Sequence, residues 1–241
     1  MNNLLKLATC LTPVCLALAA CSGSAPASEA KTQQYAAHLY IMSDVSGTSV
    51  VQGDDVVGNA LRQRVADAVK AMELGDSVTV LEVGSRSAER FVARPTITTG
   101  PKLRQAAASR KVVAQMEDIA SSYRANGGDG GTNLLLALDT LRPDCRSGRS
   151  VIMIVSDGIE SSEAYDAVAA LNAGKPVELP PPSGLLRGCH LAFVGFGVAA
   201  DGSGKGALLP EVHLRALRKG WEKYLTSAGV AASDMTFTSR I

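Results

Sequence analysis

Short apolar runs alternate along this chain with segments in which apolar residues recur with the period of a helix. The runs predict buried strands, at Leu39–Met42, Ser77–Gly84, Val151–Val155 and His190–Val198, and residues 234–241 supply a last candidate strand. Continuous apolar runs are typical of strands buried on both faces of a parallel sheet. Residues 90–99 also look extended, but Pro95 cannot donate to a central ladder, so this segment is predicted to be an edge strand.

The segments between the runs predict amphipathic helices. The first follows Asp54 and carries its apolar residues at Val57, Leu61, Val65, Ala68 and Met72. The others are expected from Pro101 to about Tyr123, at Asn133–Leu141, from about Glu163 to Ala173, and from Pro210 to Gly229. Strands that alternate with helices, without an internal repeat, predict one α/β domain on a mostly parallel sheet over residues 35–241.

The N-terminal segment 1–20 predicts a signal peptide rather than part of the fold. Its apolar run, Leu7–Ala20, is shorter than the ~20 residues that a membrane-spanning helix needs. The run ends in Leu18-Ala19-Ala20-Cys21, which resembles the lipobox of bacterial lipoproteins. The alternative is an ordinary signal peptide cut near Ala27, with Cys21 incidental. The polar residues 22–34 predict a flexible linker.

The lipobox resemblance implies cleavage before Cys21, attachment of lipid to that cysteine, and export to the cell envelope. In a bacterium with two membranes, it implies an outer-membrane anchor that faces the periplasm. Removal of the signal also removes Cys10 and Cys15, so the cysteines that remain are Cys21, Cys145 and Cys189. If Cys21 carries lipid, one pair of cysteines remains for an oxidising compartment.

Charge and composition exclude one class of partner. The chain has 24 Lys and Arg against 23 Asp and Glu, without a basic run, and aromatic residues make up 4% of it. A protein that binds nucleic acid through its phosphates needs a concentration of positive charge, and one that stacks bases needs aromatic side chains. We therefore expect no nucleic-acid partner.

Polar residues directly follow two of the predicted strands. Asp44, Ser46 and Thr48 occupy every second position after the first strand, and Asp157 follows a strand further along the chain. Thr132 precedes a predicted helix, after a glycine-rich loop. Ligand sites of parallel sheets lie beyond the carboxyl ends of the strands. Two carboxylates and three hydroxyls form an all-oxygen set that suits Mg²⁺ better than zinc or copper.

These residues resemble the three parts of the metal-ion-dependent adhesion site of von Willebrand factor A domains. The parts are "DVSGT" at 44–48, "GGT" at 130–132 and "SDG" at 156–158, in the order and on the elements that the family uses. The family's first motif is usually D-x-S-x-S, so Thr48 departs from it but keeps a hydroxyl. The resemblance covers nearly all of the chain after residue 34. It implies a Rossmann-like, doubly wound sheet of order 3-2-1-4-5-6 with an antiparallel edge strand.

The same resemblance implies a role for each residue of the set. Ser46, Thr48 and Thr132 would offer hydroxyl oxygens directly to Mg²⁺ or Mn²⁺, and Asp44 and Asp157 would act largely through water. An ion with few direct carboxylate ligands keeps most of its charge, so it can accept a carboxylate from a protein partner. The implied function is a lipid-tethered binding module that engages an Asp or Glu of that partner.

Other interpretations of these residues stay open. Asp44 could cap a loop, and Thr132 could be a helix N-cap. A strand that ends in Asp44, with Thr48 four residues on, is also similar to the haloacid-dehalogenase phosphatases, but the second acid that they place two residues after the nucleophile is here Ser46. A structural lipoprotein with a merely stabilising metal is the third possibility. Glu160 and Asp129 are expected to be solvated loop acids.

The family's sheet order also implies a disulfide. In that order the fourth and fifth strands are parallel neighbours. Cys145 lies shortly before the fourth, and Cys189 lies immediately before the fifth, so both fall at the amino ends, opposite the metal. Neighbouring strands are ~4.8 Å apart, and a disulfide needs Cα atoms within ~4.4–6.8 Å. We therefore expect Cys145 and Cys189 to be bonded.

Overall fold

A computed structural model describes residues 36–53, 56–85, 93–125, 130–145, 149–200 and 206–239. These residues belong to one unit, which begins at Tyr35. The predicted signal peptide, Cys21, the linker and Asp129 lie outside the described residues. Within the described ranges, no helix is both long enough and apolar enough to cross a membrane.

Six strands form one sheet in the order β3-β2-β1-β4-β5-β8. The strands are β1 (His38–Asp44), β2 (Ser77–Val83), β3 (Ile97–Thr98), β4 (Val151–Val155), β5 (His190–Val194) and β8 (Met235–Thr238). Parallel pairing joins β1 to β2 and to β4, β4 to β5, and β5 to β8. β3 is antiparallel to β2 and lies at the edge, just after Pro95. The predicted fold class, strand order and antiparallel edge strand are confirmed.

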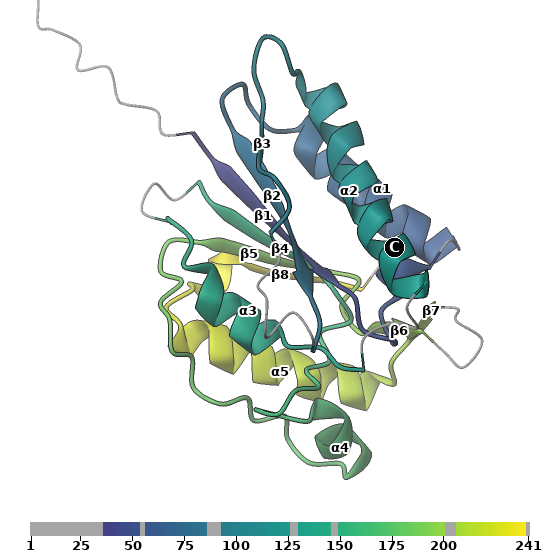
Figure 1. The fold of residues 1–241 in the computed structure, drawn as a ribbon. Coiled ribbons are helices and arrows are strands. Elements are labelled where there is room, and N and C mark those ends of the chain that lie inside the picture. The colour runs from purple at the N-terminus through teal and green to yellow at the C-terminus, as the bar shows by residue number, and fades with distance from the viewer. Residues whose placement is uncertain are drawn as a thin grey trace, which may run out of the picture. The chain divides into compact units, whose positions relative to one another are not determined.

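Helices cover both faces of this sheet (Figure 1). They are α1 (Val56–Lys70), α2 (Gln105–Ala125), α3 (Leu134–Leu141), α4 (Ala167–Asn172) and α5 (Glu211–Ser227), with 3-10 turns at Val50–Gln52 and Ala232–Asp234. α1 and α2 pack on one face through an aliphatic cluster that includes Leu61 and Met116. α3, α4 and α5 pack on the other face through a cluster that includes Leu138 and Trp221.

The continuous apolar run of β1 follows from these two cores. Successive side chains of a strand point to opposite faces of its sheet. Ile41 therefore enters the core under α1 and α2, and Met42 enters the core under α3 and α5. Both side chains are completely buried. A strand at the centre of a three-layer structure needs apolar residues at consecutive positions, which is the pattern that predicted it.

The predicted strand His190–Val198 is wrong as a single element. β5 ends at Val194, and Gly195 and Gly197 have φ of 84° and 72°. The chain then forms a separate antiparallel hairpin of β6 (Val198–Ala200) and β7 (Gly206–Leu208), which was not predicted. The backbone angle at Gly197 favours glycine, and a Cβ there would also displace the end of the Leu214 side chain.

Several helix boundaries also differ from the prediction, and α2 begins at Gln105 rather than at Pro101. α4 begins at Ala167 rather than Glu163, because Asp166 is its N-cap and accepts a hydrogen bond from the Ala169 N–H at 2.9 Å. α1 ends at Lys70, before Met72. At the start of α4 and the end of α1, the apolar pattern continues beyond the hydrogen-bonded helix, because residues in the flanking turns also pack on the core.

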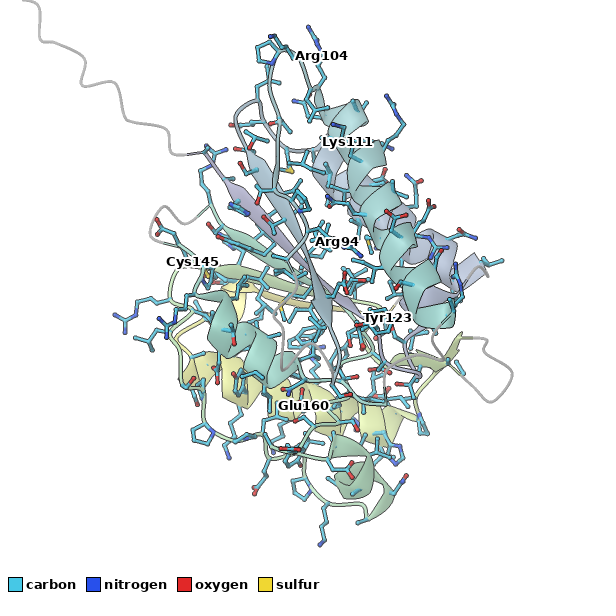
Figure 2. The ribbon with its side chains drawn as sticks, viewed as in Figure 1. Arg94, Arg104, Lys111, Tyr123, Cys145 and Glu160 are labelled. Atoms are coloured by element: carbon cyan, nitrogen blue, oxygen red, sulfur yellow. A yellow bond between two sulfur atoms is a disulfide. The ribbon has the colours of Figure 1, made fainter. Side chains whose placement is uncertain are left out.

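The predicted disulfide joins Cys145 to Cys189, with 4.8 Å between their Cα atoms. Both cysteines are buried at the amino ends of β4 and β5. Figure 2 labels Cys145, which follows the end of α3, and Glu160, whose side chain contacts the start of α3. The two labels therefore mark the disulfide and the opposite end of the sheet.

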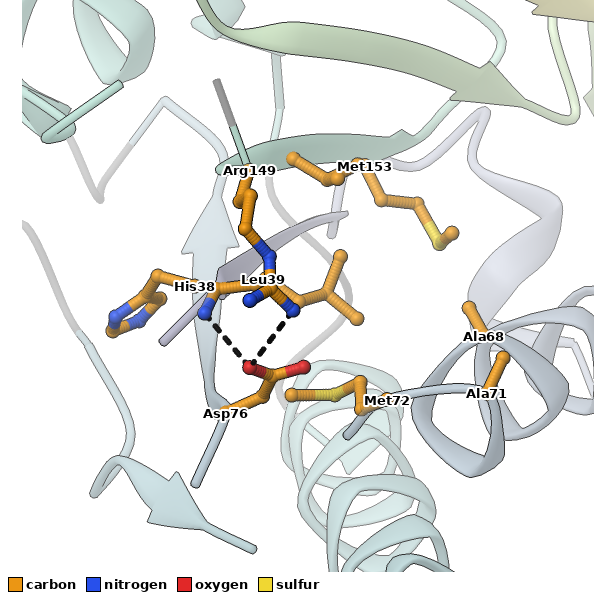
Figure 3. Close-up of a pocket in the computed structure, with 10 residues that line it drawn as sticks. His38, Leu39, Ala68, Ala71, Met72, Asp76, Arg149 and Met153 are labelled. Atoms are coloured by element: carbon orange, nitrogen blue, oxygen red, sulfur yellow. Dashed lines mark hydrogen bonds and ion pairs between the residues drawn. The ribbon is translucent and has the colours of Figure 1, made fainter. Parts of the chain in front are cut away.

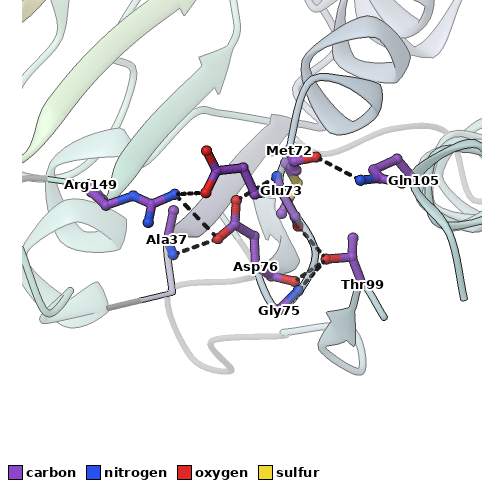
Figure 4. A network of polar contacts seen from close by, with 8 residues as sticks. All are labelled: Ala37, Met72, Glu73, Gly75, Asp76, Thr99, Gln105 and Arg149. Atoms are coloured by element: carbon purple, nitrogen blue, oxygen red, sulfur yellow. Dashed lines mark hydrogen bonds and ion pairs between the residues drawn. The ribbon is translucent and has the colours of Figure 1, made fainter. Parts of the chain in front are cut away.

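Asp76 organises the amino ends of β1 and β2 (Figure 4). Its carboxylate accepts hydrogen bonds from the Ala37 N–H at 2.7 Å and the Glu73 N–H at 2.8 Å. Arg149, just before β4, pairs with Glu73 at 2.8 Å and lies 3.7 Å from Asp76.

Beside this network is a mostly apolar cavity of about 420 Å³ between the end of α1 and the sheet (Figure 3), lined in part by Leu39, Ala71, Met72 and Met153.

Candidate functional site

The strand order brings the predicted site residues to one edge of the sheet. Asp44 is the last residue of β1, and Asp157 follows the end of β4 by two positions. These strands are parallel neighbours, with Ser43 opposite Val155. Thr132 precedes α3 and forms backbone hydrogen bonds in both directions with Ser161, which holds its loop beside the β4 end. Three loops distant in sequence thus converge.

Asp44 is completely buried and receives hydrogen bonds from all three loops. Its Oδ1 accepts from the Ser46 N–H at 2.9 Å and from the Thr132 hydroxyl at 3.4 Å. Its Oδ2 accepts from the Ser156 hydroxyl at 2.6 Å. Asp44 therefore fixes the positions of its neighbours. Ser156 was not among the predicted site residues, although it stands in the quoted motif directly before Asp157.

Ser46 and Thr48 present their hydroxyls together. The Ser46 Oγ and Thr48 Oγ1 atoms are 3.3 Å apart. Ser46 is buried, whereas Thr48 is exposed, so the set of oxygens opens to solvent at Thr48. The Thr48 carbonyl accepts a hydrogen bond from the Ala200 N–H at 2.8 Å, which attaches this loop to the β6–β7 hairpin.

Asp157 has one oxygen engaged and one without a partner. Its Oδ1 accepts from the Ile159 N–H at 2.8 Å. Its Oδ2 is buried and has no hydrogen-bond partner in the described part of the chain. The hydroxyls of Thr48 and Ser156 are near enough to favour the charged form of Asp157, although neither reaches hydrogen-bond geometry with Oδ2. A buried carboxylate oxygen without a donor is unfavourable, so its presence calls for an explanation.

Gly158 makes the turn that directs Asp157. Its φ is 78°, and a Cβ at this position would lie 2.7 Å from the Phe196 ring. Its carbonyl accepts a hydrogen bond from the Trp221 indole N–H at 2.7 Å, which ties the site to α5. The glycine of the "SDG" motif is thus required by both backbone conformation and space.

The two aspartates share a strongly acidic environment. Burial raises the pKa of Asp44, and hydrogen bonds from Ser156, Ser46 and Thr132 lower it in part. Burial, and then the charge of Asp44, raise the pKa of Asp157 well above its ordinary value. Among the described residues, neither carboxylate forms an ion pair with Lys or Arg. The site therefore holds two buried acids whose charged forms are not stabilised by a Lys or Arg of these residues, so a proton or a cation is favoured there.

The prediction that Glu160 is a solvated loop acid is wrong. Its side chain is completely buried, and its Oε2 accepts from the Leu134 N–H at 2.8 Å and the Leu135 N–H at 3.3 Å. Glu160 thus accepts hydrogen bonds from N–H groups in the first turn of α3, which have no partner within the helix. This turn begins two residues after Thr132. Sequence alone gives no signal for this contact, because the acid and the helix start are 26 residues apart.

Thr132 is also not the N-cap of α3. That position belongs to Asn133, whose Oδ1 accepts from the Leu136 N–H at 3.1 Å. The Thr132 hydroxyl is therefore directed to Asp44 rather than to the helix. A Cβ at the preceding Gly131 would overlap the Ser161 carbonyl, which explains the glycine in the "GGT" motif.

Glu160→Gln is expected to change how the stability of the metal-free protein depends on pH. Burial raises the pKa of Glu160 from 4.5 to about 7, so its folded form binds a proton more tightly than its unfolded form. Its contribution to stability is present below the unfolded pKa and is lost as pH rises through the folded pKa. Glutamine keeps an oxygen acceptor for Leu134 and has no charge to bury.

Thermal unfolding in chelator checks this prediction. The loss of stability between about pH 4.5 and about pH 7 should be smaller in Glu160→Gln than in the wild type. Glu163→Gln, at an exposed position nearby, is the matched control and should follow the wild type. An unaltered pH dependence in Glu160→Gln would contradict the prediction.

The arrangement offers oxygen ligands only. The described residues contain no group of three His, Cys, Asp or Glu placed to hold a metal. The oxygens that converge here are instead two carboxylates and three hydroxyls, from Asp44, Asp157, Ser46, Thr48 and Thr132. Such hard ligands suit Mg²⁺ and Mn²⁺ among the common metals.

Comparisons with known proteins add two distant likenesses. No protein-family model and no curated protein match the sequence. The structure is similar to an aerotolerance-related membrane protein from Bacteroides fragilis NCTC 9343, at 14% identity and a TM-score of 0.42, over 83% of this chain and 90% of that one. It is also similar to the pilus adhesin SpaC from Lactobacillus rhamnosus GG in its open conformation, at 10% identity and a TM-score of 0.45, over 85% of this chain and 28% of that one. Likenesses this distant carry no information about function.

Proposed function

We propose that this chain is a binding module of the von Willebrand factor A type, which holds Mg²⁺ or Mn²⁺ and engages an Asp or Glu of a protein partner. The observation that carries the proposal is the Asp157 Oδ2 atom, buried without a donor beside a second buried carboxylate, Asp44. A divalent cation would relieve both the missing interaction and the repulsion between the two acids.

The residues present fit such an ion. Ser46, Thr48 and Thr132 would supply hydroxyl oxygens, and Asp44 and Asp157 would hold its waters. When bound, the ion would supply an electrophilic position that a partner's carboxylate can fill. Thr48 supports this role because it is the exposed member of the set, where a partner's side chain can arrive from solvent.

A phosphatase is less well supported. An aspartyl nucleophile needs a carboxylate oxygen that can reach substrate. Both oxygens of Asp44 accept hydrogen bonds and its side chain is completely buried. Ser46, two residues on, cannot act as the acid that protonates a leaving group. The chain is therefore proposed to bind rather than to catalyse.

Crosslinking in intact cells, with and without a chelator, tests the proposed function. A partner should be recovered with the wild type when Mg²⁺ is present, and lost both with chelator and in the Asp157→Asn variant. Asp166→Asn, at an exposed helix cap, should still recover it. If metal binds and stabilises the protein but recovery of every partner is independent of metal, the site is structural and the proposal fails.

We also propose that Cys21 anchors this module to a membrane. More than one acyl chain gives stable anchoring, because each buried CH₂ contributes about 0.8 kcal/mol. Cys21→Ser is expected to move the protein from the membrane fraction to the soluble fraction, as cell fractionation would show. Cys145→Ala, which keeps the lipobox, should stay with the membrane. A wild-type protein that carries no lipid by mass spectrometry would contradict the anchor.

A further inference from the structure

A groove lies between α5 and the segment 174–178 that follows α4. It has a volume of about 470 Å³. On one wall, Ala216, Lys219 and Lys223 follow one another along α5 at helical spacing, and Ala216 contributes only a small side chain to this wall. Leu217 and Trp221 of the same helix are buried in the core, so the lysines occupy its exposed side.

The other wall is held in place by specific contacts. Gly174, with φ of 62°, follows the Ala173 C-cap of α4, and the next N–H, of Lys175, donates to the Ala170 carbonyl at 2.9 Å. Val177 is buried against Gly220 of α5, where an added Cβ would lie 2.7 Å from the Val177 side chain. A larger residue at 220 would push this wall away. The groove is therefore built into the fold before any ligand binds.

The groove carries a net positive charge. Lys175, Lys219 and Lys223 line it together with one acid, Glu178. All three lysines are exposed, and none of them forms an ion pair with any described residue. Positive groups around a recess with apolar walls concentrate their field within it and attract anions.

We propose that this groove binds an acidic segment of a protein partner. Carboxylates of the segment would meet the lysines on the two walls, and one apolar side chain would rest on Pro176 and Ala216. The charges stand on opposite sides of a recess, which suits an extended chain that enters it. A membrane surface is flat and would instead favour a protruding basic face. The groove uses no residue of the metal-binding set, so this proposal stands independently of the proposed function.

Binding of a labelled glutamate-rich peptide with a central leucine tests the proposal. Fluorescence anisotropy with the full chain, in chelator, excludes a contribution from metal. The double variant Lys219→Glu, Lys223→Glu is expected to bind at least roughly tenfold more weakly, and the wild-type affinity should fall as salt rises. The same peptide with glutamine in place of glutamate should not bind.

Two further variants decide whether the groove itself is responsible. Lys102→Glu with Arg110→Glu makes the same change in net charge at exposed positions on and before α2, which covers the opposite face of the sheet, and should leave binding unchanged. Ala216→Phe places a large side chain on the groove wall without a change of charge and should weaken binding. An equal loss in the α2 variant, or no loss in Ala216→Phe, would overturn the proposal. So would lysine-dependent binding to phosphatidylglycerol vesicles without binding to the peptide.

Discussion

Asp157→Asn is expected to weaken Mg²⁺ and Mn²⁺ binding by roughly 100-fold, the upper range for a group that holds a metal through its water shell. Asparagine keeps the oxygen that accepts from Ile159, and the atom that it changes, Oδ2, has no hydrogen-bond partner among the described residues. The variant therefore removes a charge and little else. Calorimetric titration of both ions into wild type and variant measures the effect.

Thermal unfolding separates this effect from damage to the fold. At a concentration of Mg²⁺ about 100 times the dissociation constant, a single bound ion stabilises the wild type by about 2.7 kcal/mol. Asp157→Asn should lose this gain, yet unfold without metal at the same or a higher temperature, because the charge next to Asp44 is gone.

Asp76→Asn is the matched control for the metal prediction. Asp76 is also a buried acid, but it lies at the amino end of the sheet and accepts backbone hydrogen bonds there. Its replacement should lower stability and leave the affinity for metal unchanged. Metal binding that is unchanged in Asp157→Asn, Asp44→Ala and Thr132→Ala would contradict the proposed site.

Removal of the disulfide is expected to lower the free energy of unfolding by about 4 kcal/mol in the chain-entropy model. The bond closes a loop across a sequence separation of 44 residues. In a domain of this size, that loss corresponds to a fall in Tm of roughly 10 °C. The double variant Cys145→Ser, Cys189→Ser, followed by calorimetry of thermal unfolding, checks the magnitude.

The effect should be confined to stability. The cysteines lie at the amino ends of β4 and β5, whereas Asp44 and Asp157 lie at the carboxyl ends of β1 and β4. Mg²⁺ affinity should therefore be the same in the double variant and in the wild type below their unfolding temperatures. Cys145→Ala with Cys189→Ala, which introduces no buried hydroxyl, should give a similar loss of stability. Two free thiols in the denatured, non-reduced protein would contradict the bond itself.

Local pattern was sufficient to predict most elements of this fold. β4 has its predicted bounds, Val151–Val155, because a strand covered on both faces must be apolar at every position. α3 begins one residue after the predicted Asn133, because that asparagine caps it. Gly131 and Gly158 also stand in the quoted motifs, but the reason for each glycine is a contact with a distant residue, since a Cβ there would meet Ser161 or Phe196. The strand bounds and the helix cap, by contrast, are properties that residues close in sequence impose on one another.

Other features depended on contacts between distant residues. The hydrogen bonds of Asp44 to Thr132 and Ser156 span 88 and 112 residues, and they exist only because β1 and β4 are neighbours in the sheet. The sequence shows that these residues are polar, and its pattern predicted that Asp44 and Ser156 lie at the ends of strands. Only the family's strand order suggested that they meet, and the structure has that order.

The burial of Glu160, the β6–β7 hairpin and the lysine groove were decided by tertiary structure alone. Glu160 looks like a loop acid until α3 supplies its N–H groups, and Lys175 looks like an ordinary surface lysine until α5 brings two more beside it. The sequence by itself determined the strands, the helices and the oxygen-bearing residues at the strand ends, because those follow from local hydrophobic period and backbone chemistry. Which charges are buried, paired or gathered into a groove follows from packing between elements, which no single segment encodes.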